Sequence, residues 1–306
     1  MKRLTVFTPT YNRAGLLKRA YESLVRQTSC DFVWLIVDDG STDNTREVVS
    51  SWQREGLIDI EYAYFENGGK MRAHNRGVEL AKTELFVCLD SDDYLTDSAV
   101  EELISKWDDS VRTFENGVST DAYGKPLEDR KLGGIVAHKG KSEGELLGES
   151  DFPVKGVACF TGLYDMYLKG FTGETTLMFR TDVLRGFPFP EIDGEKYVPE
   201  DYIYDKIDEI CVLAVLDRII TVCEIVSEGY TDSVMRLKRD NAKAWYLYYE
   251  QRARITPFSV RKFKYLGFYV LYAKRTGTAY NKSPIKGMNL FMGKILALWL
   301  TVMGKE

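Results

Sequence analysis

The sequence contains few of the residues that build metal centres and covalent cross-links. Its 306 residues include two histidines and five cysteines, and no two cysteines form a C-x-x-C motif. An odd, scattered set of cysteines predicts reduced thiols, and no zinc-type spacing is present. His74 and His138 each stand alone, so we expect both to be structural. The charged start runs directly into a strand-like stretch, which is unlike a leader and predicts a cytoplasmic protein.

Long apolar runs are also missing. No uncharged apolar stretch reaches about 18 residues, which argues against a membrane-spanning helix. The most apolar segment, residues 290–303, includes Lys294 and is too short to span a bilayer; it suits a buried or an interfacial helix. No G-x-G-x-x-G follows the first strand-like stretch and no G-x-x-x-x-G-K-[ST] occurs, which argues against a dinucleotide-binding domain and a P-loop.

The composition is that of a folded globular protein, but the charge is unevenly distributed. Hydrophobic residues make up 44% of the chain and charged residues 28%. From Met235 onward there are fifteen basic and three acidic residues, so this segment carries +12 while the whole chain carries −5. The sequence therefore predicts an acidic body over residues 1–234 and a basic, aromatic-rich helical extension over 235–306.

The first hundred residues alternate between strand and helix patterns. Short apolar runs predict strands at residues 4–9, 32–37, 58–65 and 85–89, and helical spacing predicts helices at 14–26, 45–54 and 71–81. This order predicts right-handed crossovers and a mostly parallel, Rossmann-like α/β sheet with flanking helices. Further strands are expected at residues 133–137 and 173–180.

Polar clusters follow three of the predicted strands, at residues 8–12, 38–41 and 90–93. Ligands bind beyond the carboxyl ends of the strands in such sheets. Asp38 and Asp39 could cap the next helix or accept hydrogen bonds from a ligand. Asp90, Asp92 and Asp93 could form a solvated acidic loop, or hold Mg²⁺ or Mn²⁺ together with phosphate oxygens.

Four motifs together resemble the inverting family-two glycosyltransferases of GT-A fold, in the style of bacterial enzymes that build capsule, exopolysaccharide or lipopolysaccharide. The motifs are PTYNR (9–13), VDDGSTDNT (37–45), NGGKMRAHNRG (67–77) and LDSDDYL (89–95). The resemblance is strongest over residues 1–100. It implies a catalytic domain over residues 1–234, in which 1–100 form the nucleotide-sugar-binding half and 101–234 the acceptor-side half. It implies a nucleotide-diphosphate sugar as donor, with UDP favoured, a glycan or lipid-linked acceptor, and Mn²⁺ or Mg²⁺ as cofactor.

The resemblance also implies roles for individual residues. Pro9, Tyr11 and Arg13 would line the nucleotide pocket, Asp39 would accept from the base with support from Asp38, and Lys70, Arg72 and Asn75 would lie near the base, the diphosphate and the pocket floor. A D-x-D motif is formed by Asp90, Ser91 and Asp92. Asp92 would bind the metal, and Asp90 would contact the metal, the ribose or the donor sugar. Asp93 would assist them.

Inversion by direct displacement requires a base near the acceptor hydroxyl. Relatives place an acidic pair about a hundred residues after the D-x-D, and Glu200-Asp201 matches it best. We expect Asp201 to be the base, with Glu200 as the alternative; the same pair could simply stabilise a helix N-terminus. Asp205 and Asp208 are expected on the exposed face of the following helix.

The basic extension allows several interpretations. Cations beside aromatic and aliphatic side chains suit an anionic membrane surface, which predicts peripheral attachment to the inner face of the cell membrane. A helical cap on the core is the alternative, and nucleic acid binding is not expected. Two other functions compete for the whole chain. One is a nucleotidyltransferase, but this sequence lacks the glycine-rich basic loop with which that class usually begins. The other is a catalytically inert GT-A-like scaffold for a membrane or partner.

Overall fold

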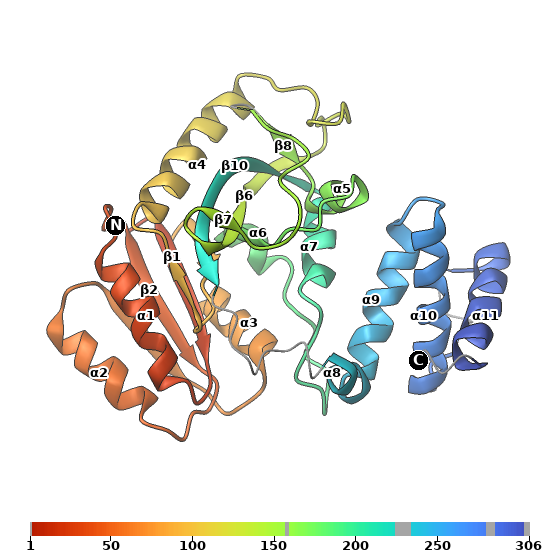
Figure 1. The fold of residues 1–306 in the computed structure, drawn as a ribbon, viewed down its shortest axis with the longest axis horizontal. Helices are drawn as coiled ribbons and strands as arrows, with labels where there is room; N and C mark the ends of the chain where they lie inside the picture. The colour runs from red at the N-terminus through yellow and green to blue at the C-terminus, as the bar shows by residue number, and fades with distance from the viewer. Residues whose placement is uncertain (1, 157–158, 224–233, 280–284, 303–306) are drawn as a thin grey trace. The chain divides into compact units, whose positions relative to one another are not determined.

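A computed structural model describes residues 2–156, 159–223, 234–279 and 285–302 (Figure 1). The strands are β1 (Leu4–Thr10), β2 (Phe32–Asp38), β3 (Ile60–Tyr64), β4 (Leu85–Cys88), β5 (Asp93–Leu95), β6 (Lys131–Ser142), β7 (Glu145–Leu146), β8 (Phe160–Thr161), β9 (Thr175–Arg180) and β10 (Cys211–Cys223). The helices are α1 (Ala14–Val25), α2 (Thr45–Glu55), α3 (Lys70–Leu80), α4 (Ala99–Glu115), α5 (Leu163–Leu168), α6 (Thr181–Arg185), α7 (Asp201–Asp208), α8 (Val234–Asp240), α9 (Ala242–Ile255), α10 (Val260–Thr276) and α11 (Gly287–Val302).

The expected parallel sheet over the first hundred residues is confirmed. β3, β2, β1 and β4 are neighbours in that order, and all three pairings are parallel. In the β1–β2 register, Leu4 lies beside Phe32 and Thr10 beside Asp38. The carboxyl ends of β1 and β2 are therefore level, and the loops that follow them leave the sheet at the same edge.

The second half of the sheet is mixed. β9 pairs antiparallel with β4 and with β6, while β10 runs parallel to β6 and antiparallel to β5. The strand expected at 133–137 exists as β6 but is much longer, and the strand expected at 173–180 is confirmed as β9. The extra length of β6 carries Lys139 to the end of β4, where the D-x-D motif lies.

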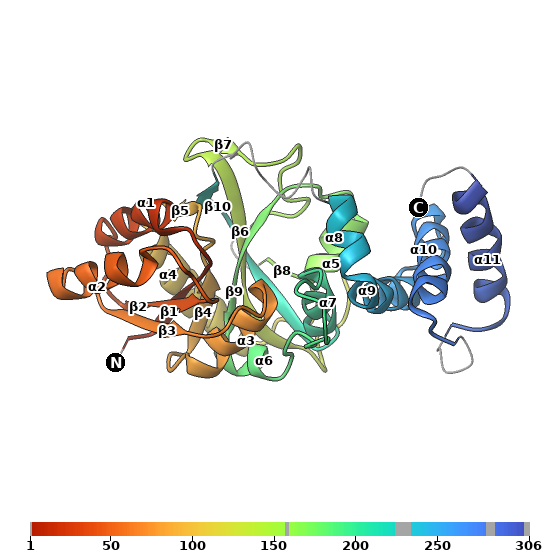
Figure 2. The ribbon, with the colours of Figure 1, turned by 90° about the horizontal axis from the view of Figure 1, so that it is seen from below.

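Helices cover both faces of the sheet (Figure 2). α1, α2 and α4 supply the core on one face, where Trp34 of β2 is fully buried. The Tyr21 and Trp52 rings stack at 4.4 Å between centroids beside it. Large aromatic rings remove much apolar surface from water, so this cluster fixes α1 and α2 on β2.

The opposite face is covered by α3, α5, α6 and α7. Phe7 of β1 packs against Phe86 of β4 and against the ring of His74, which is buried in α3. A Cβ added at Gly77 would lie 2.4 Å from the Phe7 ring, so only glycine lets α3 approach the strand this closely. His74 is therefore structural, as expected.

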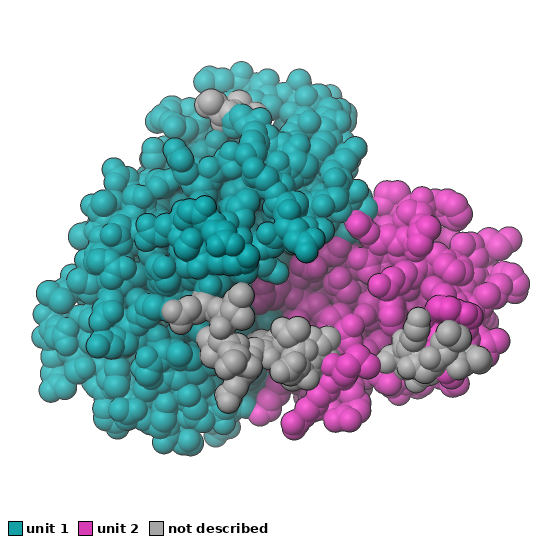
Figure 3. Space-filling view, viewed as in Figure 1, with its two compact units in different colours: residues 1–188, 203–227 teal, residues 189–202, 228–306 magenta. Residues whose placement is uncertain are grey.

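The chain forms two compact units, coloured separately in Figure 3: residues 1–188 with 203–227, and residues 189–202 with 228–306. The second unit has its own core, formed by α9, α10 and α11 around Tyr249, Leu266 and Tyr269. The helical C-terminal segment is thus confirmed, while a domain boundary at residue 234 stays a prediction. Of the basic residues counted above, Lys282 and Lys305 lie outside the described residues. None of the described helices is long and apolar enough to cross a membrane.

Candidate active site

Asp39 fastens the loop after β2 to the loop before α3. Its Oδ1 accepts a hydrogen bond from the backbone N–H of Gly68 at 2.8 Å, and its Oδ2 accepts one from the N–H of Gly69 at 2.8 Å. The Asn67 amide also donates to Oδ2, at 3.1 Å. These bonds fix the orientation of the carboxylate, whose oxygens can accept hydrogen bonds but not donate them. Gly69 has φ +94°, a conformation that side chains rarely adopt.

Asp38 supports the same turn from inside the sheet. It is 1% exposed, and its two oxygens accept from the backbone N–H of Ser41 at 2.7 Å and from the Tyr62 hydroxyl at 2.6 Å. Burial and the Asp38 carboxylate both raise the pKa of Tyr62, so this phenol stays protonated and keeps donating. Asp38 thus holds the turn that follows Asp39, and its part in nucleotide binding stays a prediction.

The loop after β1 meets the loop after β2. Asn12 has φ +52°, and its Oδ1 accepts from the N–H of Thr42 at 2.7 Å, while its own N–H donates to Ser41 Oγ at 2.8 Å. Tyr11 is left 48% exposed beside this joint, whereas Pro9 is buried within β1. The sequence placed Asn12 in the cluster without assigning it this role.

The carboxylates after β4 are surrounded by cations. Lys70 Nζ lies 2.8 Å from Asp90 Oδ1, and Arg13 Nη1 lies 3.0 Å from Asp92 Oδ2 and 3.2 Å from Ser91 Oγ. The ends of β1 and β4 and the start of α3 therefore meet at one place. We call this edge, with the loops after β1, β2 and β4, the carboxyl edge.

Lys139 is the residue at the carboxyl edge that the sequence did not predict. Its Nζ lies 3.1 Å from Asp93 Oδ2 and 4.0 Å from Asp90 Oδ2, and its side chain is 17% exposed. Burial alone would lower the pKa of Lys139, but Asp90 and Asp93 outweigh it and raise that pKa, so the ammonium persists. No local pattern marks Lys139, because its partners are more than forty residues away in the sequence.

Two of these carboxylates, Asp90 and Asp93, have pKa values shifted in opposite directions. Burial would raise the pKa of Asp90, but Lys70 and then Lys139 hold it well below the usual range. Burial raises the pKa of Asp93, although Lys139 opposes this. Cys223 Sγ lies 3.1 Å from Asp93 Oδ2, and burial raises the pKa of this thiol to about 12, so it stays protonated. Asp93 thus faces Lys139 and Cys223.

The α3 residues of the motif separate into two groups. Asn75 is 7% exposed. Arg72 packs its aliphatic chain against Gly68, where an added Cβ would lie 2.6 Å from Arg72 Cδ. Lys70 begins α3 and reaches Asp90. Lys70 and Arg72 therefore stand near the carboxyl edge, and Asn75 belongs to the packed part of the helix.

The expected base belongs to the other unit. Asp201 is the first residue of α7, and its Oδ2 accepts from Arg252 Nη2 at 2.8 Å. Burial raises the pKa of Asp201; Arg252 opposes that shift and Glu200 adds to it. The Arg252 side chain is 3% exposed and lies over the Tyr248 ring at 5.3 Å. The sequence did not reveal Arg252 as the partner, because it lies two helices later.

Comparison with known proteins decides the family. Residues 5–166, more than half of the chain, match the family model described as glycosyl transferase family 2. The chain belongs to glycosyl transferase family 2. Validoxylamine A glucosyltransferase of Streptomyces hygroscopicus subsp. jinggangensis is 45% identical over 92 residues, which are 29% of this chain and 21% of the relative. The GalNAc(5)-diNAcBac-PP-undecaprenol beta-1,3-glucosyltransferase of Campylobacter jejuni is 31% identical over 141 residues, 42% of this chain and 44% of the relative. The matches thus span less than half the length of either relative.

Solved structures of low sequence identity share the fold. S. aureus TarS 1-349 in complex with UDP-GlcNAc aligns with a TM-score of 0.62 and 17% identity, covering 96% of this chain and 79% of that one. The mannosyltransferase PcManGT from Pyrobaculum calidifontis, in complex with GDP-Man and Mn²⁺, aligns with a TM-score of 0.51 and 18% identity, covering 98% and 75%. The expected GT-A fold is confirmed.

The donor atoms of this family-two site fit a hard divalent cation. Asp90 and Asp92 offer oxygen ligands only, and each side chain is 29% exposed. Mg²⁺ and Mn²⁺ are commonly held by one or two carboxylates together with substrate phosphates. Asp93 is 7% exposed and engaged by Lys139, so it does not complete a three-carboxylate cluster. Asp92 and Asp90 are therefore the residues that would hold the ion.

The expectation for Asp205 and Asp208 is wrong. Asp205 is 4% exposed, and Asp208 accepts a hydrogen bond from the backbone N–H of Tyr164 at 2.6 Å. Burial raises the pKa of Asp208 to about 7, against the backbone hydrogen bonds and Arg130. α7 packs between neighbouring elements instead of on the surface, so the face expected to meet solvent is covered.

His138 is also not alone. Its ring stacks on Phe152 at 3.7 Å between centroids, and its Nε2 lies near carboxylate oxygens of Asp151 and Asp217. Burial lowers the pKa of His138, and Asp217 opposes this. Spacing along the sequence did not indicate this cluster, because its members come from a strand, a loop and another strand.

Proposed function

We propose that this protein transfers a sugar, with inversion, from a nucleotide-diphosphate sugar to a glycan or a lipid-linked acceptor during synthesis of a bacterial surface polysaccharide. The observation that carries the proposal is the carboxyl edge, where three strand ends bring carboxylates and cations together. UDP is favoured as the nucleotide, because a structural neighbour was solved with UDP-GlcNAc. An acceptor linked to a lipid is favoured by the name of the Campylobacter relative.

The donor binds at the carboxyl edge in this proposal. The exposed ring of Tyr11 stacks on the base, and Asp39, held by Gly68, Gly69 and Asp38, accepts from a base N–H. Further contacts come from Pro9, Ser91, Lys70, Arg72, Arg13 and Asn75. The cations among them neutralise the diphosphate. Lys70 and Arg13 pair with Asp90 and Asp92 in this structure, and they exchange these carboxylates for diphosphate oxygens when the donor binds.

Asp92, with Asp90, holds Mn²⁺ or Mg²⁺ in this proposal. When bound, such an ion stabilises the negative charge that develops on a departing nucleotide diphosphate. Lys70 and Lys139 act on Asp90, one of the two proposed metal ligands. They keep Asp90 ionised and oriented, so the carboxylate is ready to coordinate without first losing a proton.

The proton of the acceptor hydroxyl goes to Asp201. In a single displacement, the acceptor oxygen forms the new bond to the anomeric carbon as the bond to the diphosphate breaks, and the hydroxyl proton passes to a carboxylate oxygen. A base needs a carboxylate that holds a proton better than a free aspartate does. Burial gives Asp201 that property, while Arg252 keeps it oriented. Glu200 is the alternative base.

Nucleotide-dependent stabilisation tests the donor site without an acceptor. The melting temperature of the full chain is measured with UDP, GDP and dTDP, each with and without Mn²⁺. Because binding to the native state stabilises it by RT ln(1 + [L]/Kd), one nucleotide should raise the melting temperature in a metal-dependent way. The Asp92→Ala variant should lose this response.

Asp97→Ala is the matched control, because Asp97 is an exposed aspartate paired with the exposed Arg26 and not with a residue of the proposed site. It should respond as the wild type does. No response to any nucleotide in the folded wild type would favour an inert scaffold. UTP is measured beside UDP, and a clear preference for the triphosphate would favour a nucleotidyltransferase.

The C-terminal unit supports peripheral membrane attachment at the inner face of a bacterial membrane. α11 exposes large apolar side chains, with between 49% and 71% of each accessible: Met288, Phe291, Ile295, Leu298 and Trp299. Their spacing places them along one side of the helix, and Lys294 lies among them. An apolar stripe with basic neighbours suits the boundary between anionic headgroups and acyl chains.

Vesicle co-sedimentation tests this attachment. The full chain should bind vesicles with phosphatidylglycerol better than vesicles of phosphatidylcholine alone, and salt should weaken binding. Leu298→Ser combined with Phe291→Ser should release it. Equal sedimentation of the variant, or a concentration-dependent dimer that hides the stripe, would overturn the membrane proposal.

A further inference from the structure

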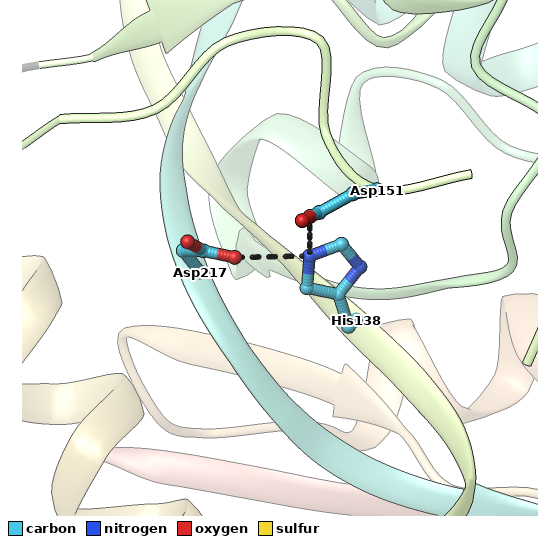
Figure 4. Close-up of side chains that lie close together, drawn as sticks. All are labelled: His138, Asp151 and Asp217. Carbon is cyan, nitrogen blue, oxygen red and sulfur yellow. Dashed lines mark hydrogen bonds and ion pairs between the residues drawn. The ribbon is translucent and has the colours of Figure 1, made fainter. Parts of the chain in front are cut away.

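A second cluster of ligand-type side chains lies away from the carboxyl edge (Figure 4). His138 Nε2 is 3.1 Å from Asp151 Oδ1 and 3.2 Å from Asp217 Oδ1, and ligand atoms of all three residues lie within 4.8 Å of one another. The side chain of His138 is 4% exposed, whereas those of Asp151 and Asp217 are 47% and 43% exposed. A buried imidazole nitrogen therefore lies beside two carboxylates that are accessible to solvent.

An irregularity in the sheet creates the cluster. β6 and β10 run parallel, with Ala137 beside Leu216, but the next pair is His138 with Ile219. Asp217 and Arg218 have no place in this register, so the strand bulges and presents Asp217 to the imidazole. Asp151, on the loop after β7, reaches the same nitrogen from another direction.

Both carboxylates approach one ring nitrogen, which a simple hydrogen bond does not explain. A single N–H directs its hydrogen at one acceptor, so the second oxygen gains little. In a metal site, by contrast, ligand atoms converge on a shared centre. With metal–ligand distances of about 2.1 Å, neighbouring ligand atoms lie about 3.0 to 3.4 Å apart, depending on geometry. The observed 3.1 and 3.2 Å match two of the three edges of such a site, and the two carboxylates offer oxygens within 4.8 Å of each other.

We propose that His138, Asp151 and Asp217 form a second divalent-cation site, of the kind that takes Zn²⁺. One imidazole nitrogen and two carboxylate oxygens suit a borderline ion, whereas Mg²⁺ prefers oxygen ligands alone. Three protein ligands leave a position for water. The cluster lines an open hollow of about 680 Å³, which provides a path from solvent.

A lysine pairs with the other oxygen of each carboxylate in this structure. Lys155 Nζ lies 2.5 Å from Asp151 Oδ2 and 3.0 Å from Asp217 Oδ2. Lys155 is exposed, so it can move into solvent when a doubly charged ion replaces it between the two carboxylates. The ion would then join β6, β10 and the loop that carries Asp151.

This site is separate from the proposed donor site. His138 and Lys139 are consecutive residues of a strand, so their side chains point to opposite faces. Lys139 meets Asp90 and Asp93, and His138 meets Asp151 and Asp217. Occupancy of the second site needs no nucleotide, and it stands whether or not the proposed transfer is correct.

Imidazole NMR of the full chain tests the proposal, because the sequence has only two histidines. The protein carries ¹⁵N-histidine and is titrated with Zn²⁺ or with Mg²⁺, and His138→Gln assigns the signals. We expect Zn²⁺ to shift the His138 ring nitrogens and Mg²⁺ to leave them in place. His74, buried against Phe7 and Phe86, is the internal control and should not respond. An unmoved His138 signal at saturating Zn²⁺ in the folded protein would overturn the proposal.

Variants at the exposed members give a second measurement, the Zn²⁺ dissociation constant read from the same titration. Asp217→Asn should raise it at least about tenfold, since a ligand is lost. Lys155→Met should lower it, because the competing cation is gone. Asp92→Asn should leave it unchanged. If Asp217→Asn binds as the wild type does, or if Asp92→Asn abolishes the shift, the proposal is wrong.

Discussion

Asp90 and Asp201 are both aspartates at proposed functional positions, yet their surroundings push their pKa values in opposite directions. At Asp90, Lys70 and Lys139 outweigh burial and hold the pKa low. At Asp201, burial dominates over the one arginine, and the pKa is raised. The number of cations thus decides which carboxylate stays charged and which can exchange a proton.

This difference matches the two tasks of the proposed reaction. A carboxylate that holds a cation and faces a diphosphate has to remain ionised throughout. A general base has to take up a proton and release it again, which is easiest when its pKa approaches the working pH. The pKa shifts of Asp90 and Asp201 therefore agree with the roles proposed for them.

The largest expected effect is at Asp201. Asp201→Asn removes the base but keeps the shape of the side chain, so we expect kcat to fall by about 10²–10⁴-fold. Binding of the nucleotide, measured by calorimetry, should be unchanged. Glu200→Gln is the matched comparison and should cost much less. A larger loss in Glu200→Gln would exchange the roles of the two residues.

Lys139 tests the other half of the comparison. Lys139→Met keeps most of the side-chain volume but removes the charge beside Asp90 and Asp93. We expect the dissociation constant of nucleotide with Mn²⁺ to rise about tenfold, because a partner that holds a buried charge contributes roughly this much. Lys141→Met, on the same strand and paired with the exposed Glu145, should change it little. Equal effects in the two variants would remove Lys139 from the site.

Arg252 should set the acid limit of the reaction. Arg252 lowers the pKa of Asp201, so Arg252→Met should raise that pKa further. The ionised base then disappears at a higher pH, and the acid limb of the kcat profile should move upward, with a several-fold loss at the acid end. Arg254→Met, an exposed arginine on the same helix, is the control. A downward shift in Arg252→Met would contradict the proposed base.

Asp208 shows that a raised pKa alone does not identify a base. Its folded pKa of about 7 exceeds the ordinary value of 3.8, so the native state binds the extra proton more tightly. The stability it supports is present at low pH and is lost as pH rises from about 4 to 7, by at most about 1.4 kcal/mol per pH unit.

Asp208→Asn cannot ionise, so urea unfolding should show a flatter decline of stability over that range. Activity at neutral pH should stay close to that of the wild type. Asp182→Asn is the control, because Arg180 lowers the pKa of Asp182 and the pair is exposed. An unchanged pH slope in Asp208→Asn would show that its carboxyl is not protonated in the native state.

Local patterns were sufficient to predict β1 to β4 and α1 to α3, but not β5, which forms by pairing with the distant β10. Each of these strands is a short apolar run or an alternating stretch and each helix has regular apolar spacing, so residues such as Phe7 and Trp34 reveal their elements without distant partners. The order of strands and helices then determines the parallel sheet. The aspartates at the strand ends could be named for the same reason, since they directly follow those strands.

Residues that act through distant contacts could not be predicted in this way. Lys139 and His138 lie in a strand whose full length depends on pairing with β9 and β10. Arg252 reaches Asp201 across about fifty residues. Asp205 has a polar side chain that suggests exposure, but tertiary packing covers it. In each case the deciding energy comes from partners that no local window contains.

β6 has a consequence for regulation. Because neighbouring residues of one strand serve the two proposed ligand sites, we expect binding at either to influence the other through β6. Thermodynamic linkage requires such an influence to be mutual. If bound nucleotide raises the affinity for the cation by some factor, the bound cation raises the affinity for nucleotide by the same factor. The proposed sugar transfer would then depend on the supply of Zn²⁺ as well as on that of the donor.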